Sequence, residues 1–503
     1  MRRGMTVAAA VFAVGAAGTV PGGSPALAAP APAALAAPAA RYAVTDLGAL
    51  AGGVSGANAV NNAGVVVGVS TVDSLRQHAV RWSANGAITD LGLLPGGASS
   101  SALAVNDAGQ VAGVADRSDG GFGYPVRWSA AGAITDLGGP ITNRLGEADG
   151  IDPAGRVVGG QRPADSEGAP VGIRYGTDGA PTELGAGLEL ARGVNARGQI
   201  VGGPAYVWQA GRVTPLPDLT GGRSALAFAI NVAGVVVGVS ATADPAAQHA
   251  VRWAGGVPTD IGTVDGISYS EARAVNSAGQ VVGTADGRCT PCAAPRAWIW
   301  QPGAPITALD TLLPAGSGWS LRAADGINDR GQIVGTGLHN GARHGYLLTP
   351  RFHANINFQP ATAPVPTGYA ADTGAAFGPR AGLTYGWAAD STANTRDRGD
   401  PAAPDQRYDT LIHLQKPGAP GTWELAVPAG SYLVHAVAGD PGFTDSVYRI
   451  SVEGVPAVTG TPTGTTHWFE GTVRVQVTDG RLTVTTGAGA VNAKLDYLDV
   501  LGA

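Results

Sequence analysis

The sequence predicts an all-β protein in which a seven-bladed β-propeller is followed by a β-sandwich (jelly-roll) domain. Three observations lead to this prediction. One ten-residue pattern recurs seven times, two further patterns keep its order and period, and strand-like segments without the repeat follow the last copy. The composition agrees, because 78 Gly and 35 Pro in 503 residues, with only 14% charged residues, are typical of a chain rich in turns and strands.

Residues 1–28 have the pattern of a signal peptide. Two arginines precede an apolar stretch, and residues 26–28 (Ala-Leu-Ala) resemble a cleavage site. We therefore expect a secreted, extracellular protein whose mature chain begins near residue 29. Residues 29–41 are an Ala/Pro-rich tract, which is typical of a disordered spacer.

Charge argues against a nucleic-acid surface, and the apolar pattern argues against a membrane span. The net charge is −6 and the arginines are scattered singly, whereas a nucleic-acid surface needs clustered Lys and Arg. After the N-terminal segment, no stretch reaches about 18 uninterrupted apolar residues, so no membrane span is predicted.

The main repeat reads small, apolar, Asn, any, any, Gly, any, apolar, small, Gly, and its first copy spans residues 59–68. Its third position is Asn in six copies and Asp in one: Asn61, Asn106, Asp152, Asn195, Asn231, Asn276 and Asn328. The spacing between copies ranges from 36 to 52 residues. A period of about 40–45 residues is typical of a four-stranded propeller blade.

Two further patterns complete each unit. One is of the His-Ala-Val-Arg-Trp type, as at 78–82, and the other is of the Thr-Asp-Leu-Gly type, as at 89–92. Turn residues separate four short strands in each unit; in the second unit these are 102–106, 110–115, 124–128 and 133–137.

The order of the patterns also predicts how the propeller closes. A strand of the Thr-Asp-Leu-Gly type at 42–47 precedes the first Asn pattern, and the seventh unit ends at Leu348 without a fourth strand of its own. We expect residues 42–47 to pair beside 344–348 and complete the last blade, because closure removes exposed sheet edges.

The units resemble a known repeat. Residues 249–253 (His-Ala-Val-Arg-Trp), 259–262 (Thr-Asp-Ile-Gly) and 274–283 carry the resemblance. Over residues 42–350 the chain resembles the HAF-type extracellular repeat of bacterial secreted proteins. The resemblance implies a fold and export and carries no activity with it.

A second domain is expected over residues 355–503, where nine or ten strand patterns indicate a β-sandwich. Segments such as 357–361, 407–413, 427–434 and 477–484 resemble malectin-like and galactose-binding-like jelly rolls. That resemblance implies a non-catalytic, glycan-binding or adhesion role.

Sugar binding needs an exposed aromatic face together with planar polar side chains. The candidate ligand-binding residues of these types are Tyr385, Trp387, Arg398, Asp409, His413 and Asp440. The alternative for Tyr385 and Trp387 is packing in the core, and the alternative for His413, which alternates with apolar residues, is a structural role. The charged loop 396–405 either holds Ca²⁺ through carboxylates or is solvated; we expect no other cofactor and no other metal.

The two cysteines, Cys289 and Cys292, form a C-x-x-C in a loop. In an exported chain a small disulfide is the expected interpretation. A redox pair or half of a zinc site is the alternative, although the chain has no second cysteine pair.

In the propeller, a residue present in nearly every unit is interpreted as a requirement of the fold. The third unit departs from the repeat, because Asp152 follows Glu147 and Asp149. Such a carboxylate group suits acid–base chemistry, or else reflects drift on an exposed turn. The long connections 285–295 and 301–321, the latter with Trp319, are candidate lips of a binding site.

The sequence therefore predicts a secreted, non-catalytic binding protein whose C-terminal domain binds polysaccharide. One alternative is a secreted propeller glycosidase or lyase with a carbohydrate-binding accessory domain. Another is a structural surface protein whose propeller binds an extracellular protein partner.

Overall fold

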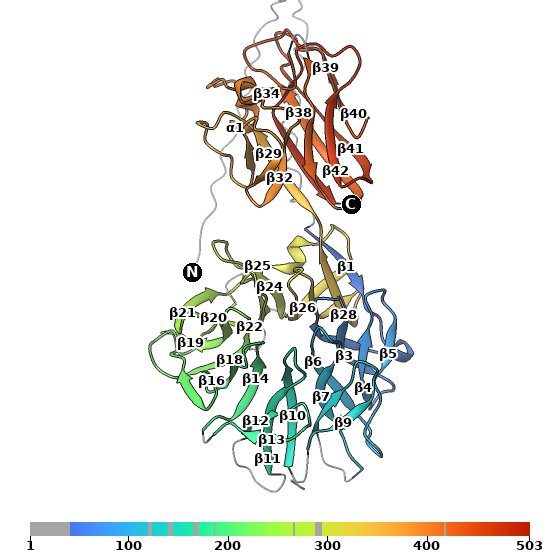
Figure 1. The fold of residues 1–503 in the computed structure, drawn as a ribbon, viewed down its shortest axis with the longest axis vertical. Coiled ribbons are helices and arrows are strands. Elements are labelled where there is room, and N and C mark those ends of the chain that lie inside the picture. Colours follow the sequence, from blue (N-terminus) through green and yellow to red (C-terminus); the bar gives the residue numbers. More distant parts are fainter. Residues whose placement is uncertain are drawn as a thin grey trace, which may run out of the picture. The chain divides into compact units, whose positions relative to one another are not determined.

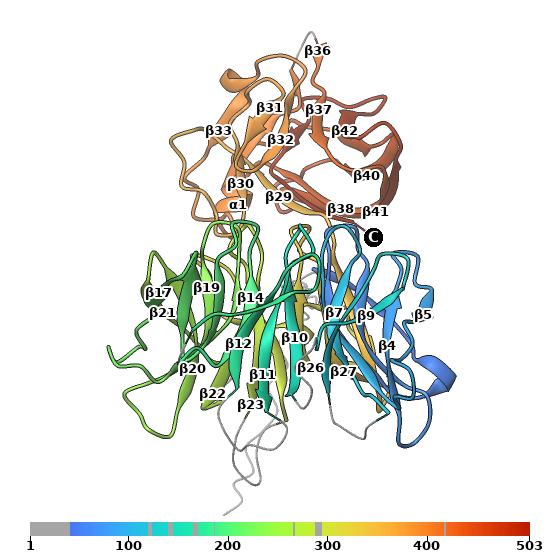
Figure 2. The same ribbon diagram turned by 60° about the horizontal axis from the view of Figure 1, so that its bottom comes forward.

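The computed structural model describes residues 41–118, 123–138, 144–163, 170–185, 187–264, 267–286, 294–416 and 419–502. The predicted all-β fold is confirmed. Strands β1–β28 form a β-propeller and strands β29–β44 form a β-sandwich (Figures 1 and 2). The expected signal peptide and spacer, up to residue 40, and both Cys289 and Cys292 lie outside the described residues.

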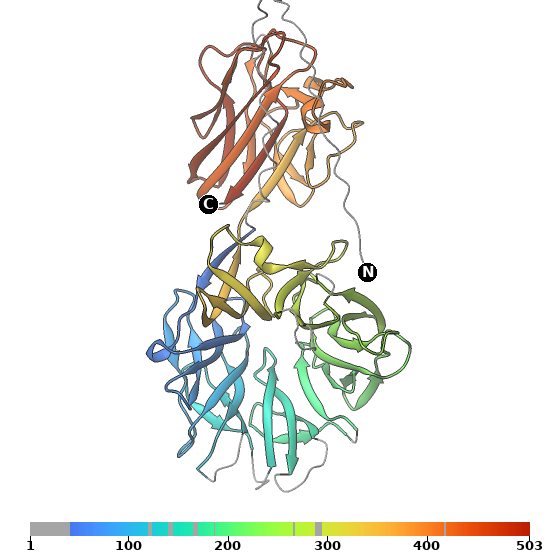
Figure 3. The same cartoon turned by 180° about the vertical axis from the view of Figure 1, so that it is seen from behind.

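Strands β1–β28 fall into seven sets of four antiparallel strands around a central axis (Figure 3). Five sets are separate sheets, and two are joined into one eight-stranded sheet by a parallel bridge between Gln248 and Tyr269.

We call each set a blade. In order, the blades are β2 (Ser55–Val60), β3 (Val66–Thr71), β4 (Gln77–Trp82) and β5 (Ile88–Asp90); β6 (Ser100–Val105), β7 (Val111–Ala115), β8 (Tyr124–Trp128) and β9 (Ile134–Asp136); β10 (Arg144–Ile151), β11 (Val157–Pro163), β12 (Val171–Tyr175) and β13 (Pro181–Glu183); β14 (Leu190–Val194), β15 (Ile200–Gly203), β16 (Tyr206–Gln209) and β17 (Arg212–Pro215); β18 (Ala225–Ile230), β19 (Val236–Ala241), β20 (Gln248–Ala254) and β21 (Val257–Gly262); β22 (Tyr269–Val275), β23 (Val281–Asp286), β24 (Arg296–Trp300) and β25 (Thr307–Ala308); and β26 (Trp319–Ile327), β27 (Ile333–His339), β28 (Ala342–Pro350) and β1 (Tyr42–Asp46). Two 3₁₀ turns, η1 (Leu50–Gly52) and η2 (Leu309–Leu312), lie between strands.

The N-terminal strand completes the last blade, as the order of the patterns predicts. Strand β1 pairs antiparallel with β28, from Tyr42 opposite Pro350 to Asp46 opposite Tyr346. The Asp46 carboxylate also contacts two imidazoles of this blade, at 2.7 Å from His339 and 2.9 Å from His344. These contacts fasten the two ends of the propeller chain to each other.

The His-Ala-Val-Arg-Trp pattern joins neighbouring blades. In β8 the indole of Trp128 is fully buried and its Nε1 donates to the carbonyl of Leu91, which belongs to the connection from the preceding blade, at 2.9 Å. The guanidinium of Arg81 in β4 donates to the carbonyl of Ala130 in the next blade at 2.8 Å. The recurring Trp and Arg are therefore packing and bridging residues, as their presence in most units predicts.

The recurring Asn residues form a ring of hydrogen bonds, which we call the Asn ring. Each Asn is buried at the end of the first strand of its blade, and its Nδ2 donates to the backbone carbonyl of the corresponding residue in the next blade. Six such bonds of 2.9–3.1 Å run Asn61 to Asn106, Asn106 to Asp152, Asn195 to Asn231, Asn231 to Asn276, Asn276 to Asn328, and Asn328 back to Asn61.

Asp152 is the member of the Asn ring that departs from Asn, and the structure gives the reason. Its side chain is fully buried, and Oδ2 pairs with Nε of Arg156 at 2.6 Å. Four other blades carry Gln at the position of Arg156, where it accepts from the ring Asn, as Gln110 does from Asn106. The Asp–Arg pair therefore replaces an Asn–Gln pair. The interpretations of Asp152 as a drifted exposed turn residue and as a catalytic acid are both corrected, because its carboxylate is buried and paired.

The β-sandwich consists of two main sheets with a core between them. The sheets have the strand orders β30-β29-β44-β38-β41 and β31-β32-β37-β42-β39-β40, with a three-stranded sheet β33-β34-β43 and a short pair β35-β36. The elements are β29 (His353–Phe358), β30 (Ala370–Asp372), β31 (Gly378–Arg380), β32 (Leu383–Trp387), η3 (Thr392–Asn394), β33 (Thr395–Asp397), α1 (Gln406–Asp409), β34 (Thr410–His413), β35 (Gln415–Lys416), β36 (Ala419–Pro420), β37 (Trp423–Ala426), β38 (Gly430–Gly439), β39 (Tyr448–Val452), β40 (Val455–Gly460), β41 (Trp468–Val477), β42 (Arg481–Thr486), β43 (Lys494–Leu495) and β44 (Tyr497–Gly502). Within the described part of the chain, no helix has the length and apolar character that crossing a membrane requires.

The Asn ring makes a testable contribution to stability. We expect Asn231→Ala to lower the free energy of unfolding by about 1–3 kcal/mol, because it leaves buried backbone groups without their partners. The double variant Asp152→Asn with Arg156→Gln installs the pair found in other blades and supplies an Nδ2 donor toward Asn195, so it should be at least as stable as the wild type. Thermal unfolding compares the three proteins; an Asn231→Ala variant that melts with the wild type would contradict the role of the ring.

Candidate functional site

Every blade has a β-bulge at the same position of its first strand. The pairing between the first and second strands shifts by one residue between two small residues, as between Ala57 and Ala59 in the first blade. The residue between them is left out of the ladder, and a bulge re-aims the side chain of such a residue. The seven bulged residues are Asn58, Leu103, Asp149, Arg192, Phe228, Arg273 and Asp325.

The last Gly of the main repeat is required by this bulge. In the first blade Gly68 faces Ala57 across the ladder. A Cβ on Gly68 would overlap the carbonyl oxygen of Gly56, and the equivalent glycine of each other blade meets the equivalent carbonyl. Only glycine leaves space for the bulged backbone. The repeated glycine in the sequence is therefore the mark of a bulge in every blade.

The bulged side chains line one central cavity of about 800 Å³ in the propeller. All seven contribute to its wall. The alanine before each bulged residue is buried and identical in all seven copies, whereas the bulged position carries five residue types: Asn, Leu, Asp, Arg and Phe. A repeat that keeps its backbone constant and varies a residue facing a cavity has the organisation of a binding site on a fixed scaffold.

Blade three places two carboxyl groups in the cavity. Asp149 is the bulged residue of β10, and Glu147 lies two residues earlier on the same strand. The Asp149 Oδ2 atom is buried and has no hydrogen-bond partner among the described residues. Burial raises the pKa of Asp149 to about 8, with a further increase from the charge of Glu147 and an opposing effect of Arg192. Burial therefore favours the protonated form of Asp149, next to a second carboxyl group.

Blades six and seven place an ion-paired group in the cavity. Arg273 pairs with Glu271 on the same strand, and its guanidinium lies 4.0 Å from the carboxylate of Asp325. The Glu271 carboxylate also accepts a hydrogen bond of 2.9 Å from the hydroxyl of Tyr269. Burial raises the pKa of Asp325 to about 6, and the charge of Arg273 opposes this effect. These side chains are already partnered within the wall.

The wall between these groups is formed by blades four and five. Arg192 lies with its guanidinium carbon 5.5 Å from the centre of the Phe228 ring, and both residues face the cavity. Arg223 and Gln248 also line the cavity. This part of the wall offers planar donor groups next to an aromatic ring.

Two long connections are expected to form the lip of a binding site. Trp319 lies in one of them. Trp319 begins β26 and its ring stacks on the imidazole of His339, with 4.7 Å between ring centres. Its role is packing within the last blade. Residues 287–293 of the other connection lie outside the described residues.

Two of the predicted ligand residues of the C-terminal domain are core residues, which corrects the expectation that they stack on a sugar. Tyr385 and Trp387 are 0% and 1% exposed. The Tyr385 hydroxyl donates to the carbonyl of Ala371 at 2.8 Å, and the Trp387 indole donates to the Asp372 carboxylate at 2.9 Å. Their rings have no face open to a ligand, because they fill the space between the two sheets.

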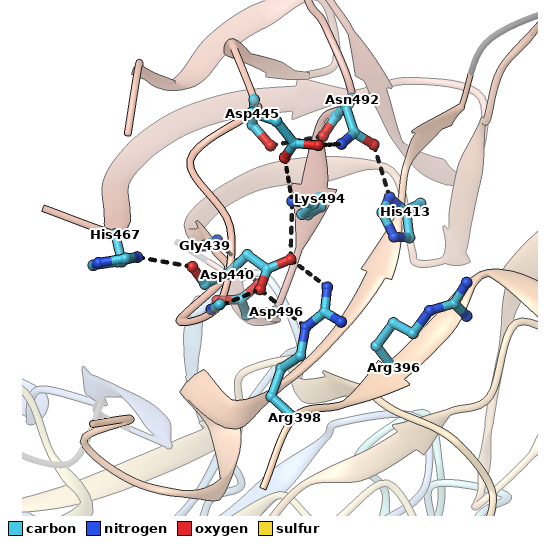
Figure 4. A network of polar contacts seen from close by, with 12 residues as sticks. Arg396, Arg398, His413, Gly439, Asp440, Asp445, His467, Asn492, Lys494 and Asp496 are labelled. Atoms are coloured by element: carbon cyan, nitrogen blue, oxygen red, sulfur yellow. Dashed lines mark hydrogen bonds and ion pairs between the residues drawn. The ribbon is translucent and has the colours of Figure 1, made fainter. Parts of the chain in front are cut away.

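Two other predicted residues, Arg398 and Asp440, do come together (Figure 4). The guanidinium of Arg398 binds both carboxylate oxygens of Asp440, with Nε at 2.9 Å from Oδ1. The ammonium of Lys494 lies 2.9 Å from Asp440 Oδ2 and 3.1 Å from Asp445. Asp440 and Lys494 are almost fully buried, so this network holds loops of the sandwich together.

The remaining two predicted residues border this network. The Asp409 carboxylate accepts the backbone N–H groups of Gly399 and Asp400 at 2.9 and 2.8 Å, so it shapes the charged loop. His413 contacts the side chain of Asn492 at 2.9 Å. Burial lowers the pKa of His413 to about 4, and nearby positive charges, including that of Lys494, lower it further.

The sequence does not mark one exposed aromatic residue of the C-terminal domain, Phe443. Phe443 is 49% exposed, and the guanidinium carbon of Arg398 lies 4.6 Å from its ring centre. Its position in a loop after β38 gives no periodic signal. Among the described residues, no group of three or more His, Cys, Asp or Glu side chains is arranged to hold a metal ion, and the charged loop 396–405 directs its Asp405 carboxylate to Arg407.

The cavity residues could have been found from the sequence by aligning the seven copies. The position three residues before the ring Asn or Asp is the variable one between two small residues. The departure of the third unit from the repeat singles out Glu147 and Asp149, whereas nothing in the single copies marks Arg192, Phe228, Arg273 or Asp325. A propensity-based search does not identify a bulge, because the small residues beside it are also ordinary strand residues in a crowded blade.

Comparison with known proteins gives weak likenesses. No protein-family model matches the chain, and no curated protein sequence matches it. Among solved structures, the protein YXIM of Bacillus subtilis is 22% identical over 30% of this chain and 40% of its own, with a TM-score of 0.24. A streptogramin B lyase is 10% identical over 61% of this chain and 97% of its own, with a TM-score of 0.36.

A third structure, a family 35 carbohydrate-binding module from Clostridium thermocellum, is 24% identical over 18% of this chain and 85% of its own, with a TM-score of 0.13. The chain covers less than half of the length of the Bacillus subtilis protein YXIM. Strand pairing, and not these likenesses, establishes the two folds.

The buried network of the sandwich should respond strongly to loss of its central anion. We expect Asp440→Ala to lower the free energy of unfolding by about 3–5 kcal/mol, because it leaves the buried Lys494 ammonium and the Arg398 guanidinium without their shared partner. Exposed Asp479→Ala is the control. Chemical unfolding of both variants measures the difference; equal stability would show that the network is dispensable.

His413 should make the C-terminal domain sensitive to acid. Its pKa is lowered from 6.5 to about 4 in the folded state, so the unfolded chain takes up a proton first as the pH falls. The stability contribution is therefore present above pH 6.5 and is lost progressively as the pH falls towards 4. His413→Gln, which does not titrate, should lose less stability than the wild type between pH 7 and 4.5 in unfolding experiments. Parallel losses in both proteins would refute this role.

Proposed function

We propose that this protein binds a glycan in the central cavity of its propeller and that it acts outside the cell. The observation that carries the proposal is the set of seven bulged residues, which comprise five residue types on a backbone that repeats. Export is supported by the pattern of residues 1–28 and by the resemblance of the units to extracellular HAF-type repeats.

The chemistry of the wall fits a polyhydroxylated ligand. Planar side chains such as Arg192, Asn58 and Gln248 can each meet neighbouring hydroxyl groups with more than one hydrogen bond. Phe228 supplies an apolar ring for the C–H faces of a sugar. The cavity volume of about 800 Å³ lies within the range of about 300–1,000 Å³ that small-molecule sites occupy. A ring of mixed polar groups with an aromatic residue favours a sugar over an apolar ligand.

The charges of the wall restrict the class of ligand further. Arg273 pairs with Glu271 and lies 4.0 Å from Asp325, so it offsets part of their negative charge within the wall. Arg192 and Arg223 line another part of the wall together with Asp149, whose protonated form is favoured by burial. This side of the cavity can therefore accept a ligand that carries a negative group.

The C-terminal domain is the second candidate position for a glycan. Its resemblance to malectin-like jelly rolls supports this proposal, and so does the exposed ring of Phe443 beside Arg398. Exposed aromatic rings next to planar cationic groups are the side chains that sugar stacking requires. This position replaces the one first expected at Tyr385 and Trp387.

Glycan binding by the full chain tests the proposal and separates the two positions. We expect retention of at least one soluble glycan on an array, with about tenfold weaker binding by Phe228→Ala because the stacking contact is lost. Leu75→Ala, which removes a fully exposed side chain of the propeller, should bind as the wild type does. Sensitivity to Phe443→Ala without sensitivity to Phe228→Ala would place the site in the C-terminal domain. Failure to retain any glycan would overturn the proposal.

A further inference from the structure

We propose that the propeller cavity cleaves its glycan by β-elimination at a uronic acid residue, with Glu147 as the base, Asp149 as the acid and Arg192 as the group that holds the uronate carboxylate. This inference rests on the proposed glycan site and adds a reaction and a substrate class to it. It departs from the sequence-based expectation of a non-catalytic protein.

The first support is the position of the two carboxyl groups. Glu147 and Asp149 come from one strand, two residues apart, and both face the cavity. The backbone between them is bulged, with the shift between Ala148 and Gly150. Because both residues come from this strand and line the cavity, their carboxyl groups approach a bound sugar from the same side.

The second support is the state of Asp149. Its Oδ2 atom is buried and unpartnered among the described residues, although buried polar atoms normally find a partner. A protonated carboxyl group with one free oxygen can donate its proton to a ligand atom that enters the cavity. Glu147 favours this state, because its charge opposes ionisation of Asp149.

The third support is the cation on the neighbouring blade. Arg192 is the bulged residue of β14, and it is near enough to Asp149 for its charge to lower the pKa of that carboxyl. A guanidinium binds a carboxylate with two parallel hydrogen bonds. A uronate held in this way places the carbon next to its carboxylate close to Glu147 and Asp149.

The reaction balances without a further reactant. Glu147 removes the proton from the carbon adjacent to the uronate carboxylate, and Arg192 stabilises the negative charge that develops on that carboxylate. The electron pair forms a carbon–carbon double bond as the bond to the glycosidic oxygen breaks. Asp149 gives its proton to that oxygen, which leaves as a hydroxyl group. Exchange with solvent then returns a proton to Asp149 and removes one from Glu147.

The same geometry disfavours hydrolysis. Glycoside hydrolysis uses two carboxyl groups that flank the scissile bond, one on each side. The carboxyl groups across the cavity, Glu271 and Asp325, are engaged by Arg273. Removal and donation of a proton on one side of the sugar suits an elimination.

The test uses the full chain with polygalacturonate, alginate and hyaluronate as acidic probes and amylose as the neutral one. We expect at least one acidic probe to give products that absorb in the ultraviolet through the new double bond and whose masses lack the added water of hydrolysis. Amylose should be unchanged. The rate should fall as the pH rises through about 8, since Asp149 then loses its proton.

Variants assign the roles. Asp149→Asn and Glu147→Gln should each lower the rate by about 100-fold or more while they keep glycan binding and the thermal midpoint. Arg192→Ala should raise KM for the acidic probe. Asp178→Asn, at a turn of the same blade where Asp178 binds the N–H of Ala180, is the matched control and should be fully active.

Each other outcome counts against a defined part of the inference. Binding of acidic glycans without any unsaturated product would overturn the reaction and leave the proposed function intact. Products that contain added water would overturn elimination in favour of hydrolysis. Full activity of a folded Asp149→Asn protein would overturn its role as the acid. Absence of binding to every glycan would overturn the proposed function as well.

Discussion

The side chain of one asparagine in six of the seven units joins neighbouring blades of the propeller. Its Oδ1 accepts backbone N–H groups of its own turn, as from Val65 to Asn61, and its Nδ2 reaches the backbone of the next blade. A hydrogen bond made in a buried, low-dielectric position is costly to lose, because the freed carbonyl has no access to water. The Asn ring therefore fixes the ends of the first strands around the axis. The bulged residues lie three positions before the residues of the Asn ring, so their positions are fixed as well. The wall of the cavity is fixed with them.

This arrangement separates the residues that build the scaffold from those that face the ligand. Small residues flank the bulge, a glycine opposes it, and a buried Asn follows it, so the backbone path is the same in every blade. The bulged residue is outside the ladder, and its side chain faces the cavity and its neighbours in adjacent blades, as Arg192 faces Phe228. Its identity is therefore free to vary without loss of the blade, and Asn, Leu, Asp, Arg and Phe all occur there. Blade three shows that even the Asn ring can change, provided that Arg156 supplies the partner that Asp152 needs.

The C-terminal domain uses its charged residues in another way. Asp440 and Lys494 are buried between loops. Arg398, which is more exposed, also forms an ion pair with Asp440. Buried charges of this kind are costly to desolvate and are retained where they fix the arrangement of chain segments. The exposed part of the same region is Phe443, which lies over Arg398. The structural network and the proposed glycan contact at Phe443 thus share Arg398. Residue type alone therefore pointed to Arg398 and Asp440 but not to their role.

The sequence by itself determined the repeat, the four strands of each unit and the closing strand, because these depend on local turn residues, on alternation and on the order of the patterns along the chain. It also singled out Glu147 and Asp149. Tertiary structure alone decided that Tyr385 and Trp387 are core residues, since burial depends on the opposite sheet of the sandwich. It alone decided that Asp152 pairs with Arg156 whereas Asp149, three residues earlier, faces a cavity. A bulge shifts the alternation of a strand by one residue, and only the paired strand shows where that shift falls.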